Sequence, residues 1–315
     1  MTAEDPTGDI MSDEGTAVPT LRFEEARSAE IVGESFAGTQ DPRLKELLTK
    51  LVEHLHAFVK DVKLTPEEWE QAIQYLTAVG QKCSDTRQEF VLLSDTLGVS
   101  MLVATLAGEG GAELTEATVE GPFHVVASPV RENGADLNDA GAPGEPLLVT
   151  GRVTDEAGQP VAGAKVDVWH ANAQGFYDVQ KPDELGVGNL RAMLTADEDG
   201  RFWFRTIVPS FYPIPTDGPV GTLLRATSRH EFRPAHIHFE VSAPGLRTLT
   251  THIFVAGSPY ITSDAVFGVK ESLIFDFAVV DDAARAAEVG LPNPFRHVDF
   301  PVVLHREEPA ESAGA

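Results

Sequence analysis

The spacing of hydrophobic residues predicts a helical first part of the chain. Between residues 42 and 62 apolar residues recur every three or four positions, which indicates one buried face on a long helix. Asp41 followed by Pro42 is typical of a helix N-cap with proline in the first turn. The segment Thr65–Glu68 has the pattern of a capping box and predicts a second helix. We expect a third helix to start at Asp85 and to carry the apolar residues as far as Met101.

The pattern changes near residue 110 and favours short strands. Glycine and proline become frequent, and turn sequences separate runs that are rich in β-branched and aromatic residues. The expected strands cover 146–153, 164–170, 201–207, 222–228, 236–242, 248–256, 272–280 and 298–304. Many short strands without helices between them are typical of an antiparallel β-sandwich. The predicted fold class is therefore α+β, with an N-terminal helical domain followed by a β-sandwich.

The ends of the chain differ from these two domains. Residues 1–20 are acidic and poor in large apolar side chains, so we expect a disordered tail. Residues 306–315 have the composition of a loose tail. The predicted domains are accordingly a helical domain over 21–110 and a β-sandwich domain over 111–305.

Composition narrows the classes of partner and of metal site. The 315 residues carry a net charge of −25, which disfavours nucleic acid and anionic membranes as partners. We expect no membrane insertion and a cytoplasmic location, because the sequence has neither a signal-peptide pattern nor a long apolar run. Cys83 is the only cysteine, so a metal would have to be bound by histidine, carboxylate or tyrosine.

Two histidines and two tyrosines form the candidate metal site. His236 and His238 alternate along a predicted strand, so their imidazoles point to the same face. A histidine pair of this kind, taken alone, is more often an ordinary part of a sheet. Tyr177 and Tyr212 lie in the two loops that precede it, and each alone is more often a hydrogen-bonded tyrosine. Phenolate oxygen is a hard anionic donor that suits ferric iron.

Several sequence blocks together resemble the intradiol ring-cleavage dioxygenases. They are GPFHV (121–125), DVWHANAQGFYD (167–178), PSFYPIPTDGPVG (209–221), RPAHIHF (233–239) and SDAVFGVK (263–270). Residues 64–103 resemble the N-terminal domain of the catechol and hydroxyquinol 1,2-dioxygenase branch. The similarity covers about residues 22–304, and LLSDTLGV, GFYDVQ and SDAVFGVK are most similar to the hydroxyquinol enzymes.

This resemblance implies an iron enzyme that cleaves an aromatic ring with O₂. Fe(III) would be bound by Tyr177, Tyr212, His236 and His238, with Tyr212 and His238 as the axial pair. A diol that chelates as a dianion would displace Tyr212, which would accept one of its protons. The resemblance also implies that Arg233 stabilises negative charge on the ring. A salt bridge that holds the metal loop is the alternative role for this arginine.

The same resemblance predicts the substrate pocket. The expected substrate contacts are Leu92, Asp95, Val119, Gly121, Ile214, Pro215, Arg233 and His252. His252 stands where many catechol 1,2-dioxygenases carry glutamine, so a catalytic hydrogen bond is expected from an imidazole. We expect hydroxyquinol to be preferred and to give 3-hydroxymuconate, the enol form of maleylacetate, with Asp95 contacting the third hydroxyl. Catechol and chlorocatechol remain alternative substrates, and a helix-surface or inter-domain carboxylate is the alternative role of Asp95.

The apolar stripe on the first long helix predicts an interface. It is longer than a small helical unit needs, and the resemblance implies a homodimer formed through the helices of about 22–108. The resemblance also makes a bound lipid possible at that interface. Two other classes of function stay open at this point. The first is a non-catalytic β-sandwich binding module, and the second is a zinc hydrolase, although the sequence lacks an HExxH motif.

Overall fold

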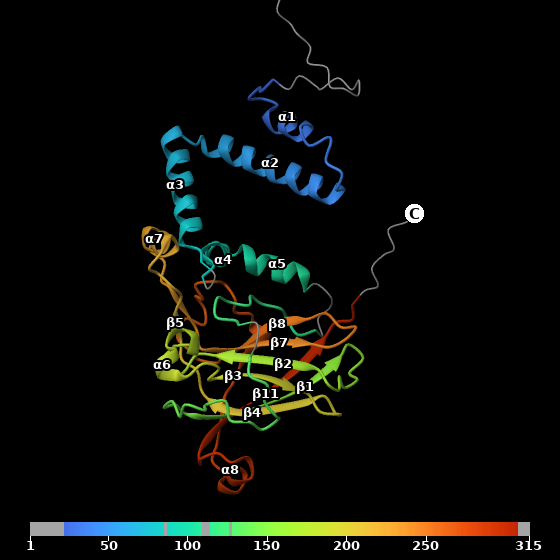
Figure 1. Cartoon of the computed structure of the whole chain (residues 1–315), viewed down its shortest axis with the longest axis vertical. Coiled ribbons are helices and arrows are strands. Elements are labelled where there is room, and N and C mark those ends of the chain that lie inside the picture. Colours follow the sequence, from blue (N-terminus) through green and yellow to red (C-terminus); the bar gives the residue numbers. More distant parts are fainter. Residues whose placement is uncertain (1–21, 85–86, 109–113, 126–127, 308–315) are drawn as a thin grey trace, which may run out of the picture. The chain divides into compact units, whose positions relative to one another are not determined.

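The computed structural model describes residues 22–84, 87–108, 114–125 and 128–307 (Figure 1). The chain forms two compact units, of which the first runs to Gln74 and the second begins at Tyr75. The predicted N-terminal tail and the predicted helix start at Asp85 lie outside the described residues. Arg306 lies in the segment predicted to be loose, yet it forms an ion pair with Asp155 at 2.7 Å.

The first helices form as their capping residues predict. The structure has α1 at Ser28–Glu34, α2 at Pro42–Val62 and α3 at Pro66–Lys82. The Asp41 side chain accepts hydrogen bonds from the backbone N–H groups of Arg43 and Leu44. Thr65 and Glu68 exchange the two hydrogen bonds of a capping box, at 2.9 and 3.2 Å. The two long helices predicted here are confirmed.

The expected single helix after residue 85 is wrong, because the structure divides it in two. Helix α4 covers Glu89–Thr96 and α5 covers Val99–Ala107, and their axes differ by 78°. Gly98 lies between them with a φ of 74°, in the left-handed region that favours glycine and ends a helix. No single helix in the described ranges is long and apolar enough to cross a membrane, and the bent α4–α5 pair meets that test only jointly.

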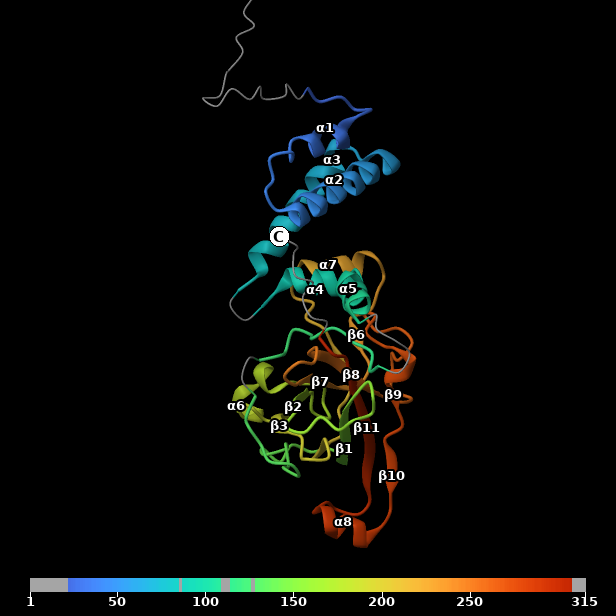
Figure 2. The same cartoon turned by 90° about the vertical axis from the view of Figure 1, so that its right-hand side faces the viewer.

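Two main sheets build the second unit (Figure 2). One has the order β10–β11–β1–β4 and the other β3–β2–β7–β8–β9. Their strands are β1 Pro146–Asp155, β2 Lys165–His170, β3 Arg191–Thr195, β4 Arg201–Ile207, β7 His236–Ser242, β8 Leu249–Val255, β9 Ile274–Phe275, β10 Ala278–Val280 and β11 Phe295–Leu304. The α+β class is confirmed, but the sheets are mixed. Strand β1 pairs with β11 in parallel, and β8 pairs with β9 in parallel.

The alternation along β7 separates the core from the functional face. Ile237, Phe239 and Val241 are fully buried in the main hydrophobic core, together with side chains from the other sheet. Because strand side chains alternate, His236 and His238 lie on the opposite face of the sheet. The five-stranded sheet thus has one apolar face toward the sandwich core and one face free to carry polar groups.

The expected strand at 222–228 is wrong, because this segment belongs to helix α7, Pro219–Ala226. Pro219 stands in the first turn of that helix, and Val220 and Leu224 are buried on one side, four positions apart. The expected strand at 272–280 is interrupted, since it holds the turn η2 at Glu271–Leu273 and two short strands. Prediction missed β3 and the short helices α6, Pro182–Leu185, and α8, Ala283–Val289.

Candidate metal centre

The candidate ligands come from three neighbouring parts of the second unit. His236 and His238 project from β7, and His238 is paired with Trp169 on β2 and with His252 on β8. Tyr177 follows β2 and precedes the turn η1, Asp178–Gln180. Tyr212 begins the two-residue strand β5, Tyr212–Pro213, which pairs with β6, Phe232–Arg233. The predicted motifs, which are separate in the sequence, therefore lie close together in the structure.

Four donor atoms form a closed ring at this place. The Tyr177 hydroxyl oxygen is 3.4 Å from that of Tyr212 and 3.1 Å from His238 Nε2. His236 Nε2 is 3.4 Å from the Tyr212 oxygen and 3.1 Å from His238 Nε2. Donors bound about 2.0–2.1 Å from one ion, with angles near ~105° between them, are ~3.1–3.4 Å apart. The spacing of all four atoms therefore fits a single metal ion.

Burial sets the protonation of the two histidines. Burial lowers the pKa of His236 and of His238 well below the usual value, so both imidazoles are neutral. His236 Nδ1 donates to the Pro234 carbonyl oxygen at 2.7 Å, which leaves the lone pair of Nε2 for the ring of donors. Neutral imidazole with a free Nε2 is the form that binds metals.

Burial raises, rather than lowers, the pKa of the two tyrosines, because their charged form is the deprotonated one. It raises the pKa of Tyr177 well above its usual value and also raises the pKa of Tyr212, while Arg233 opposes the second shift. Phenolates at this fully buried place would require a nearby positive charge. The donor set therefore fits a hard metal cation, which would supply that charge.

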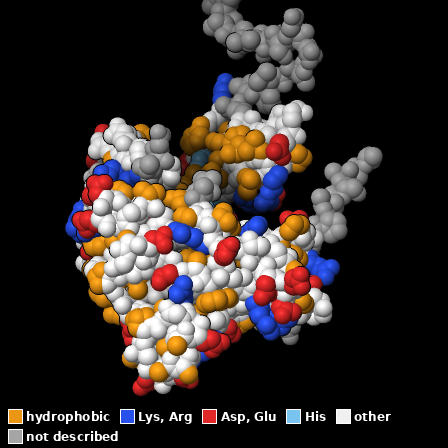
Figure 3. Space-filling model, turned by 60° about the horizontal axis from the view of Figure 1, so that its bottom comes forward, with side chains coloured by type: hydrophobic (Ala, Val, Ile, Leu, Met, Phe, Trp, Pro, Cys, Tyr) orange, Lys and Arg blue, Asp and Glu red, His pale blue; other side chains and the backbone are white. Residues whose placement is uncertain are grey.

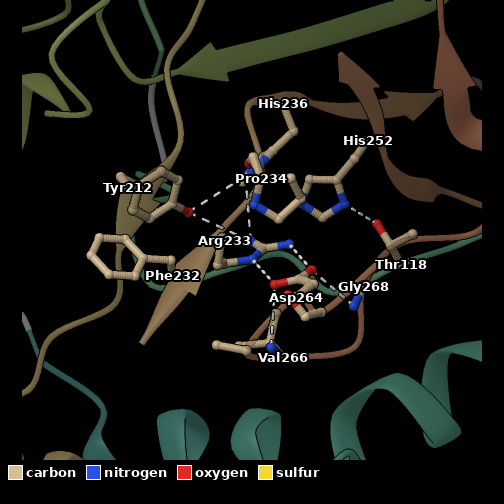
Figure 4. Close-up of polar contacts among 12 residues, drawn as sticks. Thr118, Tyr212, Phe232, Arg233, Pro234, His236, His252, Asp264, Val266 and Gly268 are labelled. Carbon is tan, nitrogen blue, oxygen red and sulfur yellow. Dashed lines mark hydrogen bonds and ion pairs between the residues drawn. The ribbon is translucent and has the colours of Figure 1, made fainter. Parts of the chain in front are cut away.

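Arg233 is held beside the ring of donors by an ion pair. Its Nε and Nη2 donate to the two carboxylate oxygens of Asp264 at 3.1 and 3.2 Å (Figure 4). Its Nη1 donates to the Tyr212 oxygen at 3.5 Å and lies 3.3 Å from His236 Nε2. Asp264 also accepts from the backbone N–H groups of Val266 and Gly268. Both roles considered for Arg233 are thus compatible with one geometry.

His252 lies next to His238, with a ring-centroid distance of 4.1 Å. Its Nδ1 is hydrogen bonded to the Thr118 hydroxyl, and its Nε2 has no partner among the described residues. Burial lowers the pKa of His252 well below its usual value. One ring nitrogen of a neutral, buried imidazole is thus left for a ligand.

The other predicted substrate contacts lie on the helical side of the same unit. Leu92, Val119 and Ile214 are buried in one hydrophobic cluster. Pro215 is half-buried and follows Ile214 in the chain. Asp95 is buried, which overturns its alternative role on a helix surface, and burial raises its pKa while Ser100 and Arg233 oppose the shift.

Gly121 lies against a candidate ligand. With a φ of 80°, it approaches the imidazole so closely that an added Cβ would lie 3.0 Å from His238 Cε1.

Three further residues that contact the site were not identified from the sequence. Phe123 stacks on Tyr177 at 4.6 Å, Trp169 stacks on His238 at 4.7 Å, and Asp264 binds Arg233. All three lie inside the sequence blocks quoted above, so their positions were marked although their contacts were not.

Comparison with known families and proteins gives consistent matches along the chain. Residues 41–113 match the family model described as catechol dioxygenase N terminus, and residues 119–306 match the model described as dioxygenase. The chain is 53% identical over 285 residues to hydroxyquinol 1,2-dioxygenase of Rhizobium sp. (strain MTP-10005), covering 90% of this chain and 96% of the relative. It is 35% identical to catechol 1,2-dioxygenase of Acinetobacter baylyi, over 84% of this chain and 86% of that one.

Solved structures agree with these matches. The crystal structure of hydroxyquinol 1,2-dioxygenase from Pseudomonas putida DLL-E4 superposes with a TM-score of 0.81 and 45% sequence identity. The matched region covers 90% of this chain and 99% of that one. Non-haem iron is the metal that this family implies, and the two phenols and two imidazoles described above fit it. The chain is an enzyme that belongs to the intradiol ring-cleavage dioxygenases, in the hydroxyquinol 1,2-dioxygenase branch.

Proposed function

We propose that this enzyme cleaves hydroxyquinol between its two adjacent hydroxyl-bearing carbons, giving 3-hydroxy-cis,cis-muconate, the enol form of maleylacetate. The observation that carries the proposal is the buried ring of two phenols and two imidazoles beside Arg233. The names of relatives such as the Rhizobium enzyme, which is 53% identical, support this substrate. Catechol and chlorocatechol are the alternative substrates.

The metal is proposed to be Fe(III), bound by Tyr177, Tyr212, His236 and His238. Phenolate is a hard donor, which favours ferric iron over the zinc of a hydrolase. When bound, the iron would chelate the diol and make its ring reactive toward O₂. The charge of two phenolates and one hydroxide would balance that of Fe(III), which suits a site with fully buried ligands.

The protein residues then have separable tasks. The Tyr212 oxygen accepts one proton of the diol, because the proton affinity of a phenolate is close to that of the substrate phenol. Nη1 of Arg233 lies beside that oxygen and places a permanent positive charge where negative charge builds up on the ring. His252 offers Nε2 to an oxygen of the substrate or product.

Selection of the third hydroxyl is assigned to Asp95. It is a buried carboxylate on α4, the helix that also carries Leu92, and the charges of Arg233 and Asp264 act on it. A buried hydroxyl without a partner costs about 1–3 kcal/mol, so a pocket for hydroxyquinol needs an acceptor. Walls against the ring would be formed by three buried apolar side chains, Leu92, Val119 and Ile214.

Oxygen uptake with hydroxyquinol, catechol and chlorocatechol tests the function. We expect the highest kcat/KM on hydroxyquinol, and Asp95→Ala should lower it there by roughly ten- to a hundredfold while catechol changes little. Asp299→Asn, an exposed carboxylate on β11, is the matched control and should change neither value. Equal losses on both substrates would make Asp95 structural. A higher native efficiency on catechol would reject the substrate assignment.

We also propose a homodimer that buries the apolar stripe of α2. This helix has no buried residue, and seven of its large apolar side chains are 43–54% exposed. They are Leu44, Leu47, Leu51, Leu55, Phe58, Val59 and Val62. Figure 3 shows hydrophobic side chains gathered over the N-terminal helices. Light scattering at micromolar concentration should give twice the chain mass, and lipid extraction would show whether a lipid shares the stripe; a monomer would refute the dimer.

A further inference from the structure

A second cluster of possible metal ligands lies on the same sheet face as the ring of donor atoms from Tyr177, Tyr212, His236 and His238, which is called the iron ring below. Glu120, His124 and Glu240 each place one ligand atom so that all three lie within 4.8 Å of one another. Asp167 lies beside this group, because its Oδ2 is 3.6 Å from His124 Nε2. We propose that Glu120, His124, Asp167 and Glu240 form a second site, for a divalent cation of the Mn²⁺ or Zn²⁺ class.

The strand register places the two central carboxylates side by side. Asp167 on β2 is the direct partner of Glu240 on β7. Like charges in directly opposite positions on one sheet face destabilise the pairing. No lysine or arginine contacts either carboxylate within ion-pair distance among the described residues. A divalent cation between the two strands would remove this repulsion.

Asp167 provides an observation that is independent of the clustering. Its side chain is 3% exposed, and its Oδ1 has no hydrogen-bond partner among the described residues. A buried carboxylate oxygen without a partner costs substantial free energy, so it requires a proton, a donor or a cation. The neighbouring imidazole already faces Oδ2. A cation bound by Oδ1 or by both oxygens would satisfy the remaining acceptor.

His124 completes the donor set from the loop above the sheet. Its Nδ1 contacts the Glu120 carboxylate and its Nε2 faces Asp167. The close contact with the Asp167 carboxylate raises the pKa of His124 above its usual value, and Glu120 and Glu240 add to the effect. The group therefore has three carboxylates around one imidazole. One imidazole nitrogen with several carboxylate oxygens is a donor set that suits Mn²⁺ and Zn²⁺.

The position of the cluster gives the cation a structural role. His124 packs on Trp169 with ring centroids 4.7 Å apart, and the other neighbour of Trp169 is His238 of the iron ring. Glu120 and His124 flank the loop that carries Gly121 against His238. A cation bound by this loop and by β2 and β7 would fix the loop at its place beside the iron site.

Titration of the iron-replete, full-length protein with Mn²⁺ tests the proposal. Electron paramagnetic resonance of the free ion should show one saturable site per chain, displaced by Zn²⁺ and insensitive to excess Mg²⁺. Asp167→Asn should weaken this binding at least tenfold, and Glu240→Gln should do the same if the first variant does not fold. Bound Mn²⁺ should also raise the Tm of the native protein but not that of the variants.

The matched control is His305→Gln. His305 contacts Glu156 in another His–Glu pair, for which the described residues provide no third ligand. This variant should bind Mn²⁺ as tightly as the native protein does. Binding that is absent, or that is equally strong in Asp167→Asn and in the native protein, would overturn the site. Iron content and turnover are measured separately, so failure here is distinguishable from failure of the proposed ring cleavage.

Discussion

Two polar clusters on one face of the β2–β7–β8 sheet show how position sets the chemistry of a histidine. His238 and His124 both pack against Trp169, at the same centroid distance of 4.7 Å. Burial lowers the pKa of His238, whereas the nearby Asp167 carboxylate raises the pKa of His124. One imidazole is thus kept neutral among phenols, whereas the other binds a proton more readily because carboxylates surround it.

The two histidines differ in pKa because they lie beside neighbouring rows of cross-strand partners on the same sheet face. The row that contains Trp169, His238 and His252 is covered by Tyr177 and the loops, and its members are almost completely buried. The next row on the same face contains Asp167 and Glu240, and it opens toward a side chain, Glu120, that is 52% exposed. A two-residue step therefore separates the dry ring of donor atoms from a wetter, acidic cluster.

The sharpest way to separate the two clusters is Tyr177→Phe. This change removes one anionic donor from the ring, and we expect loss of most bound iron, of the red-brown tyrosinate colour and of activity by at least about a hundredfold. Mn²⁺ binding at the acidic cluster should be unchanged. Metal analysis and the visible spectrum measure the first effect. Tyr260→Phe is the control, because its ring stacks on Phe232 outside the donor ring.

Unchanged iron content and colour in Tyr177→Phe would show that Tyr177 is no ligand. Stoichiometric zinc without a visible band in the native protein would reject the iron site as a whole. Loss of Mn²⁺ binding in the same variant would mean that the two clusters are one cooperative unit.

The sequence predicted those parts of the molecule that depend on local patterns. Caps and apolar spacing predicted α2 and α3, and the order of motifs predicted the four donors that the structure brings together. It failed at 222–228, which was predicted as a strand although 222–226 consists mostly of good helix formers. In the structure this segment continues α7 from Pro219, with Val220 and Leu224 buried four positions apart.

The acidic cluster shows why the other contacts were missed. His124 does not belong to a recognisable metal-ligand motif. Its partners come from a loop and two strands that only the sheet register brings together. The partner of Arg233 is similar, since Asp264 is remote in sequence and its role depends on the loop that carries it. The sequence blocks included His124, Asp167 and Asp264 but did not indicate what each one contacts, and Glu120 and Glu240 lie just outside the blocks.

Asp264→Asn should have a smaller effect than Tyr177→Phe, and the effect should be confined to the site beside Arg233. Arg233 and Asp264 are 1% and 2% exposed, and removing one partner of a buried ion pair costs about 3–5 kcal/mol. We expect a lower Tm and a lower kcat, because the guanidinium is no longer held toward the Tyr212 oxygen, while iron remains bound. Glu116→Gln, which breaks a more exposed pair with Lys270, is the control. Full kcat in Asp264→Asn would show that the ion pair does not position Arg233.

Gly121→Ala should give the smallest change, and it has a nearly ideal control within the chain. The new Cβ would lie 3.0 Å from His238 Cε1, on a backbone with a φ of 80°. Gly163 has a φ of 76° and nothing within 4 Å of such a Cβ, so Gly163→Ala imposes the backbone strain without the contact. Both variants should lose about 1–2 kcal/mol of stability. Only Gly121→Ala should also displace the imidazole, shift the charge-transfer band and weaken iron binding by a few-fold, which a titration with an iron chelator measures. Equal spectra in the two variants would show that the loop does not hold His238 in place.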